Sequence, residues 1–230
     1  MVYAVIAAGG TGIRAKKELP KQFIEVCGKP IVIHTLEKFE AVKEFRRIIL
    51  LCPEEWTEYA KKLVDSHFEK SFIKVISGGQ TRNDTIMKAI DFIAETDGLT
   101  DDTVIVTHDA VRPLVTGDII RNHIDTIPFC DAIGTVIPAT DTVIISKDGK
   151  KVKSVTDRGN VFQCQTPQTF RAKRLKMLYN SLSENQKKAL TDTCSIFTVS
   201  GEEVRLVAGE ASNFKITYPT DLKIAEALLK

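Results

Sequence analysis

The chain has 230 residues, and its 32 Lys and Arg residues against 30 Asp and Glu give a formal net charge of only +2. With 43% hydrophobic and 27% charged residues, the composition is that of a globular protein, which excludes a largely disordered chain. The basic residues are dispersed, and Asp148 and Gly149 interrupt the densest stretch, so we expect no nucleic-acid-binding face. The N-terminal apolar run is too short for a signal peptide or a membrane span, and the five cysteines form no C-x-x-C pair. We therefore expect a cytoplasmic protein with free thiols and no membrane partner.

Strand and helix patterns alternate through the first half of the chain. Short apolar runs predict strands at 2–7, 47–52, 72–76 and 103–107, and amphipathic stretches predict helices at 31–42, 54–68 and 82–95. This alternation predicts a Rossmann-like α/β fold, in which a mostly parallel sheet carries helices on both faces. Ligands bind such sheets at the carboxyl ends of the strands. The loop 9–12, Gly78-Gly79 and His108-Asp109 each follow a predicted strand, so we expect them to meet at one edge.

After residue 130 the pattern changes to closely spaced strands, predicted at 132–138, 142–146, 152–156 and 161–165. Between the middle two, Lys147-Asp148-Gly149-Lys150 places an Asp-Gly hairpin turn. Because a hairpin cannot bury both of its faces alone, we expect residues 139–160 to project as an arm that packs on a second copy. Helices at 171–182 and 219–229 and strands at 204–207 and 214–217 complete one domain over residues 1–230.

A glycine-rich loop that also carries Arg14 and Lys21 follows the first strand. Glycines let backbone N–H groups surround a phosphate, and the cations neutralise its oxygens, so we predict a phosphorylated nucleotide as ligand. Residues 10–15 also satisfy the dinucleotide fingerprint, but Pro20 would break the helix that this fingerprint requires. No Gly-Lys-Ser/Thr follows the glycines, which excludes a Walker A loop. A structural turn with surface cations is the alternative, and it explains the two cations less well.

His108-Asp109-Ala110-Val111-Arg112-Pro113 follows a strand at the expected ligand edge. Asp109 can hold Mg²⁺ between phosphate oxygens, and Arg112 can clamp a phosphate with two hydrogen bonds. The alternative is a helix-capping Asp beside an Arg. His108 has no metal-ligand partner at useful spacing, so we interpret it as a structural histidine.

The segment 78–85 ends a strand and begins a helix. Gly79 allows close approach of the backbone to a ligand, and Thr85 could hydrogen-bond a base or ribose. An ordinary helix N-terminus capped by Asn83 or Asp84 explains the segment equally well.

Motifs along the whole chain together resemble the cytidylyltransferases that activate sugar-alcohol phosphates with CTP. In chain order these motifs are A-A-G-G-T-G-x-R (7–14), P-K-Q-F (20–23), G-G-x-x-R (78–82), H-D-A-V-R-P (108–113), D-T (141–142), D-R (157–158), Q-T-P-Q-T-F (165–170), T-D (191–192) and N-x-K-I-T (213–217). The family has two branches, which act on 2-C-methyl-D-erythritol 4-phosphate and on ribitol 5-phosphate.

The resemblance implies that a phosphate oxygen of the acceptor attacks the α-phosphorus of CTP and releases pyrophosphate. It implies that the catalytic residues are Arg14, Lys21 and Lys215 and that Asp109 holds Mg²⁺. The residues that it assigns to the nucleotide are Ala7, Ala8, Gly9, Gly10, Thr11, Gly12, Gly79, Arg82 and Thr85. Those that it assigns to the acceptor are Arg112, Thr142, Arg158, Thr166 and Thr191. In the family, the residues matching Thr142 and Arg158 reach the partner's active site from the arm, which predicts a homodimer.

Local differences between the branches bear on the acceptor. The glycine loop is one residue longer than is usual in the methylerythritol branch, Val111 replaces its usual Ala, and residues 190–197 resemble the L-T-D-A-C-K-I-F of the ribitol branch. We therefore predict D-ribitol 5-phosphate as the acceptor, with 2-C-methyl-D-erythritol 4-phosphate as the alternative and another pentose phosphate or sugar phosphate as the second alternative. A reductase that supplies the polyol phosphate is a candidate partner. A regulatory nucleotide-binding subunit without catalysis is the non-enzymatic alternative.

Overall fold

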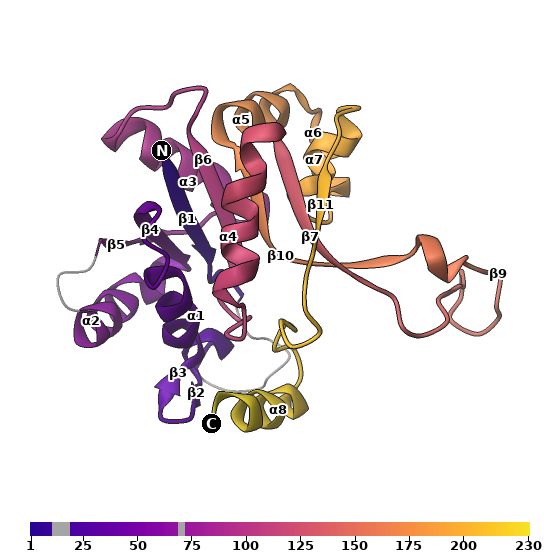
Figure 1. Ribbon diagram of the computed structural model, residues 1–230, viewed down its shortest axis with the longest axis horizontal. Coiled ribbons are helices and arrows are strands. Elements are labelled where there is room, and N and C mark those ends of the chain that lie inside the picture. The colour runs from indigo at the N-terminus through magenta and orange to yellow at the C-terminus, as the bar shows by residue number, and fades with distance from the viewer. Residues whose placement is uncertain (11–18, 69–71) are drawn as a thin grey trace.

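A seven-stranded sheet of order β11-β7-β10-β6-β1-β4-β5 forms the centre of the computed structural model, which describes residues 1–10, 19–68 and 72–230 (Figure 1). Strand β1 lies parallel between β4 and β6, β5 is parallel to β4, and β11 is parallel to β7. Strand β10 runs antiparallel to both β6 and β7. The strands are β1 (Val2–Ala7), β4 (Phe45–Cys52), β5 (Ile73–Ser77), β6 (Val104–Asp109), β7 (Ala132–Pro138), β10 (Phe162–Arg171) and β11 (Arg205–Ala208). The predicted mostly parallel sheet is confirmed.

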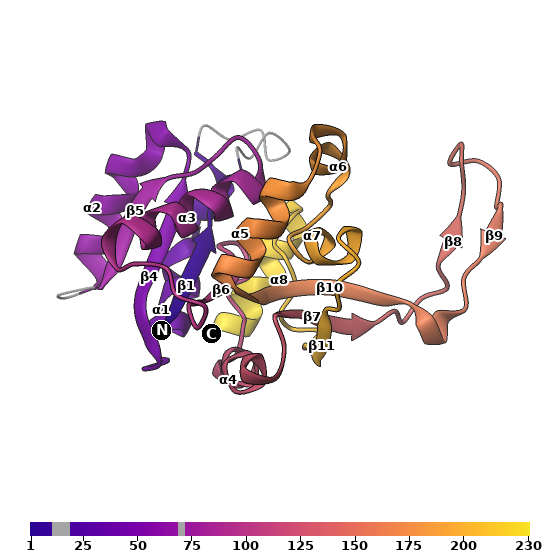
Figure 2. The same cartoon turned by 90° about the horizontal axis from the view of Figure 1, so that it is seen from above.

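Helices cover both faces of the sheet, as predicted. Ala4 and Ile6 of β1 pack in one cluster with α1 (Ile31–Glu40), α2 (Thr57–His67) and α4 (Gly117–Thr126). Tyr3 and Val5 pack on the opposite face with α3 (Arg82–Thr96), α5 (Ala172–Ser181) and α7 (Cys194–Val199). Figure 2 shows α3 and α5 on one side of the sheet and α4 on the other. Burial on both faces explains why β1 is apolar throughout.

Shorter elements lie around the glycine-loop end of the sheet. The paired strands β2 (Glu25–Val26) and β3 (Lys29–Pro30) precede α1, and α8 (Pro219–Leu229) packs on them through a small apolar cluster with Val26, Ile31 and Ala225. Helix α6 (Glu184–Ala189) precedes α7. None of the helices in the described ranges is long and apolar enough to span a membrane.

Several elements differ from the prediction, among them the helices α6 and α7 and the short strands β2 and β3, which were not expected. Helix α4 was not expected, although Thr116 provides an N-cap by accepting a hydrogen bond from the Ile119 amide. The strand predicted at 214–217 is wrong: this segment joins no ladder, and its Ile216 amide instead donates to the Val111 carbonyl. Strand β10 continues past its expected end at 165 through a register shift between Gln165 and Gln168.

Residues between β7 and β10 form the predicted arm, which extends away from the sheet in both views (Figure 1, Figure 2). Strands β8 (Ile144–Ile145) and β9 (Ser154–Val155) pair antiparallel. Between them Gly149 has φ +69°, and an Asp148 carboxylate oxygen accepts hydrogen bonds from the amides of Lys150 and Lys151. The arm leaves four apolar side chains exposed: Ile144, Ile145, Val152 and Val155. Its packing on a second copy stays a prediction.

Candidate active site

A cavity of about 270 Å³ lies at the carboxyl ends of β1, β5 and β6. Segments far apart in the sequence line it: Ala7, Ala8, Gly9, Gly10, Lys21, Gln22, Gly79, Gln80, Thr81, Arg82, Thr85, Asp109, Val111 and Lys215. The predicted meeting of the three post-strand segments at one edge is therefore confirmed. A larger hollow of about 980 Å³ lies over β7, β10, β11 and α7, but it contains none of the glycine-loop residues. Size alone does not identify the site.

The loop after β1 is held by its neighbours through backbone groups. The Ala8 amide donates to Leu51 of β4, and the Ala7 carbonyl accepts from the Ala110 amide. The buried Gln22, which the sequence reasoning missed, donates from Nε2 to the Ala8 carbonyl at 2.7 Å. The sequence feature that could have indicated Gln22 is a polar residue inside Pro-Lys-Gln-Phe, directly before Phe23, which is buried. The predicted residues Thr11, Gly12 and Arg14 lie outside the described residues.

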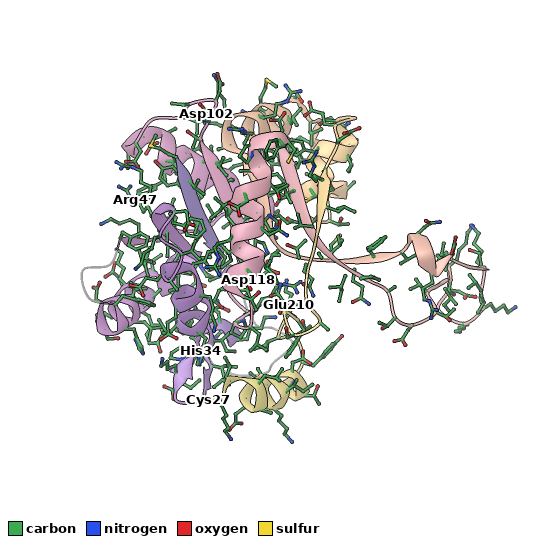
Figure 3. The ribbon with its side chains drawn as sticks, in the orientation of Figure 1. Cys27, His34, Arg47, Asp102, Asp118 and Glu210 are labelled. Carbon is green, nitrogen blue, oxygen red and sulfur yellow. The ribbon has the colours of Figure 1, made fainter. Side chains whose placement is uncertain are left out.

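Lys21 lies in the 3₁₀ turn Lys21–Phe23 and reaches the other end of the chain. Its Nζ donates to the Ile216 carbonyl at 2.9 Å, next to Lys215. The segment that carries Lys215 is anchored at Glu210, whose carbonyl accepts from Gln165 Nε2. The Thr116 hydroxyl also donates to the Glu210 carboxylate at 2.8 Å, and Figure 3 shows Glu210 beside the end of α4 that carries Asp118.

The loop before α3 is held by hydrogen bonds among its own residues. The Gly79 amide donates to the Thr85 hydroxyl at 3.0 Å, and that hydroxyl donates to the Thr81 carbonyl at 2.9 Å. A Cβ atom on Gly79 would lie 2.5 Å from the Asp84 Cβ, so only glycine fits. The cap of α3 is Thr81 in a capping box with Asp84, rather than Asn83 or Asp84 itself. Thr85 thus has a structural task, and its predicted contact with the nucleotide stays a prediction.

Asp109 lies among three cations. Its Oδ1 is 3.3 Å from Arg82 Nε, and its Oδ2 is 3.4 Å from Arg112 Nε and 3.1 Å from Lys215 Nζ. Burial alone would raise the pKa of the Asp109 carboxyl, but Arg82, Lys215 and Arg112 outweigh burial and hold this pKa far below its usual value. Three positive charges against one negative charge leave an excess that suits a phosphate ligand.

Asp109 is the only carboxylate among the described residues that line the cavity, so side chains alone build no metal site there. Within the described residues, no group of three or more His, Cys, Asp and Glu side chains could hold an ion. Both carboxylate oxygens of Asp109 are already in ion pairs with Arg82, Arg112 and Lys215. The role of Asp109 as an Mg²⁺ ligand stays a prediction, and we derive no chemical step through a metal.

The turn after β6 is fixed from several sides. The Asp109 amide donates to the Thr166 hydroxyl at 3.1 Å, and Arg112 Nη1 donates to the Asn213 carbonyl at 2.9 Å. His108 lies fully buried beneath the turn, and burial lowers its pKa to about 3, so the imidazole is neutral at pH 7. Among the predicted acceptor residues, Arg112 and Thr166 therefore lie at the site.

The segment with Thr191 adjoins the same site from the α7 side. Gln168 Nε2 donates to the Asp192 carboxylate at 2.6 Å, and Arg82 Nη1 donates to the Thr193 hydroxyl at 2.5 Å. The sequence reasoning missed the part that Gln168 and Asp192 play, because these contacts join positions 24 or more residues apart.

Thr142 and Arg158 lie on the arm, which projects away from the sheet whose strand β6 ends at Asp109 (Figure 1). Both are exposed, and Arg158 Nη1 donates to the Thr140 carbonyl of its own arm at 3.1 Å. One chain does not bring these two predicted acceptor residues to the site.

Comparison with known proteins gives the family. The family model described as 2-C-methyl-D-erythritol 4-phosphate cytidylyltransferase (IspD) matches residues 2–230. The chain is 27% identical to 4-diphosphocytidyl-2C-methyl-D-erythritol synthase from Anaerococcus prevotii, with a TM-score of 0.81 over 100% of this chain and 96% of that one. It is 27% identical to 2-C-methyl-D-erythritol 4-phosphate cytidylyltransferase from Francisella tularensis, with a TM-score of 0.82 over 98% of each chain. It is 25% identical to the Thermus thermophilus enzyme of the same name, with a TM-score of 0.74 over 99% of this chain and 98% of that one. The chain therefore belongs to the IspD family and is a nucleotidyltransferase of the cytidylyltransferase class.

Proposed function

We propose that the chain transfers the cytidylyl group of CTP to 2-C-methyl-D-erythritol 4-phosphate. The family model and the Francisella and Thermus relatives carry the name of that acceptor, and the Anaerococcus relative carries the name of its cytidylylated form. It was the alternative acceptor of the sequence analysis, and the comparisons favour it over ribitol 5-phosphate, which they do not support. The observation that carries the chemistry is the group of three cations around Asp109, beside the cavity formed by the glycine loops.

The reaction joins two anions, so charge neutralisation is the main task of the site. A phosphate oxygen of the acceptor attacks the α-phosphorus of CTP, and the bond from that phosphorus to the bridging oxygen breaks. The electron pair leaves with pyrophosphate. The attacking phosphate is already ionised at pH 7, so no general base is needed, and a neutral, buried His108 agrees with this.

Lys21 and Lys215 come from opposite ends of the chain, and both bring positive charge to the cavity. They lie close together because Lys21 Nζ donates to the carbonyl of Ile216, the residue after Lys215. We assign them to the α-phosphate and its developing charge, together with Arg14. The loops 7–12 and 79–85 hold the nucleotide, with Arg82 between nucleotide and acceptor. Mg²⁺ that accompanies CTP would be held mainly by the phosphate oxygens, because the Asp109 carboxylate oxygens are paired with Arg82, Arg112 and Lys215.

The homodimer belongs to this proposal. Thr142 and Arg158 lie on an arm that carries exposed apolar side chains and projects away from the sheet of its own chain. A second copy that receives the arm would bury those side chains and bring Arg158 to an anion site.

Ribitol 5-phosphate is the second candidate acceptor. The segment 190–197, which resembles the ribitol branch, joins the site through the bonds of Gln168 to Asp192 and of Arg82 to Thr193. It therefore lies where it could distinguish one polyol chain from another.

Pyrophosphate release with CTP and Mg²⁺ tests the proposal, with the two polyol phosphates offered in parallel. Selective turnover of methylerythritol 4-phosphate is expected. Selective turnover of ribitol 5-phosphate would refute the proposed acceptor and leave the transfer chemistry in place. CTP binding without turnover of any sugar phosphate would refute the enzymatic assignment.

A further inference from the structure

His108 bonds to both ends of the turn that carries Asp109 and Arg112. Its Nε2 lies 3.1 Å from the Arg112 carbonyl, and its Nδ1 lies 3.0 Å from the Thr166 hydroxyl. The same hydroxyl oxygen accepts a hydrogen bond from the Asp109 amide at 3.1 Å. The ring is fully buried and packs against Phe39 of α1, with ring centroids 5.1 Å apart.

The direction of each hydrogen bond follows from elementary chemistry. A carbonyl oxygen can only accept, so Nε2 carries the proton that binds the Arg112 carbonyl. A neutral imidazole has one N–H, which leaves Nδ1 as an acceptor. The Thr166 hydroxyl must therefore donate to Nδ1, and its oxygen lone pair receives the Asp109 amide.

We propose that His108 is a positioning residue. It holds the Arg112 carbonyl directly and the Asp109 amide through the Thr166 hydroxyl, and it thereby fixes the geometry of the acceptor side of the site. Asp109 and Arg112 form an ion pair across this turn, and His108 fixes the backbone at each end of the pair. A shift of either end would move the carboxylate relative to Lys215 and Arg82.

The nucleotide side is held by other bonds. Gln22 holds the Ala8 carbonyl, and Thr85 holds the Gly79 amide. Loss of the His108 bonds should therefore raise the KM for the acceptor and leave the KM for CTP unchanged. This expectation rests on the proposed function, because it places the acceptor at Asp109 and Arg112.

Two substitutions separate the two bonds of His108. Asparagine places an oxygen near the position of Nδ1, so His108→Asn keeps an acceptor for Thr166 and loses the donor to Arg112. Glutamine places an amide nitrogen near the position of Nε2, so His108→Gln keeps that donor and loses the acceptor.

His34 provides the control. It is a buried histidine of α1 whose Nε2 bonds the Val26 carbonyl at 2.7 Å, and it lies near Cys27 and away from Glu210 (Figure 3).

Hydrogen exchange of the Asp109 amide in the free enzyme is the first readout, because it does not depend on the acceptor. With the Val106 amide of the same strand as reference, His108→Gln should speed exchange at Asp109 about tenfold, the factor that corresponds to about 1.4 kcal/mol. His108→Asn should keep the protection. Thr166→Val should lose it, and adding His108→Gln to Thr166→Val should cause no further loss. Equal exchange in the Gln and Asn variants would overturn the proposal.

Steady-state kinetics with whichever acceptor the enzyme turns over is the second readout. Both His108 variants should raise the acceptor KM about tenfold with an unchanged CTP KM. His34→Asn should lower the melting temperature and change neither KM. If the wild-type enzyme turned over no acceptor, the proposed function would fail, while the Asp109 exchange would still decide the role of His108. Equal increases of both KM values would overturn that role.

Discussion

Lys21 donates a hydrogen bond of 2.9 Å to the carbonyl of Ile216, a residue 195 positions later in the chain. This bond places the cation of the glycine-loop region beside Lys215, whose Nζ lies 3.1 Å from the Asp109 carboxylate. Charges from the two ends of the chain thus meet at the cavity where β1 and β6 end. Such prearranged donors stabilise charge that develops in a transition state more than charge in the ground state.

Lys21→Ala should lower kcat by roughly 10²–10³-fold, equivalent to about 3–4 kcal/mol of barrier, because one preorganised cation at the α-phosphate is lost. Single-turnover measurements with saturating CTP and acceptor would check this. Lys29→Ala is the matched control, since Lys29 pairs with Glu37 at 2.6 Å and is 44% exposed. A wild-type kcat in Lys21→Ala would remove Lys21 from the mechanism.

Asp109→Asn should weaken the fold and the acceptor side of the site, because three cations would lose their shared counter-charge. The free energy of unfolding should fall by about 1–3 kcal/mol, less than for a fully buried pair because Lys215 is 44% exposed. Urea denaturation measures this loss.

The same Asp109→Asn variant tests the metal assignment through the Mg²⁺ concentration for half-maximal activity. This concentration should be unchanged, because both carboxylate oxygens face cations and the phosphates supply the ligands of the ion. An increase of several-fold or more would instead establish Asp109 as a ligand.

Local sequence patterns predicted those elements whose limits are marked by residues next to them in the sequence. Strand β1 (Val2–Ala7) is buried on both faces and ends at glycines, and α8 (Pro219–Leu229) begins with a proline, so both have the predicted bounds. The Asp148-Gly149 turn needs only its own residues, because the carboxylate binds the next amides and the glycine takes the positive φ. Such elements are determined within a few residues.

Long-range contacts explain what the sequence could not show. The segment 214–217 has the composition of a strand. Its Ile216 amide nevertheless donates to the Val111 carbonyl, and the Ile216 carbonyl accepts a hydrogen bond from Lys21 Nζ. Asn213 supports β10 by donating to the Thr166 carbonyl, and no local pattern indicates this contact. The sequence likewise marked Asp109, Arg82, Arg112 and Lys215 as site residues, but not that all three cations pair with the one carboxylate.

Acid should destabilise the fold through two buried histidines. Burial lowers the pKa of His108 and of His123 to about 3, and both rings would take up a proton near pH 6.5 in the unfolded chain. The unfolded state then binds more protons than the folded state between about pH 6.5 and 3. The free energy of unfolding is therefore highest above pH 6.5 and falls as the pH drops, by about 1.4 kcal/mol per pH unit for each histidine.

Urea denaturation between pH 6.5 and 5 checks this, with His123→Gln as the informative variant. His123 bonds the hydroxyls of Thr169 and Thr135, and burial is the main cause of its low pKa, with a smaller effect of His108. The variant should lose one histidine's share of the pH slope, whatever its absolute stability. Equal slopes in the variant and the wild type would contradict a neutral, buried His123.

Sharing of the site between two chains predicts complementation. Arg158 lies on the arm and Lys21 at the cavity of the same chain, so in a dimer that exchanges arms each site takes the two residues from different copies. Lys21→Ala and Arg158→Ala homodimers should each be impaired. After subunit exchange in an equal mixture, half of the dimers are hybrids with one intact site of two, so about a quarter of wild-type activity should return. Co-purification of an affinity-tagged Lys21→Ala chain with an untagged Arg158→Ala chain measures the exchange. No recovery after verified exchange would show that each chain completes its own site, and the arm would then have another role.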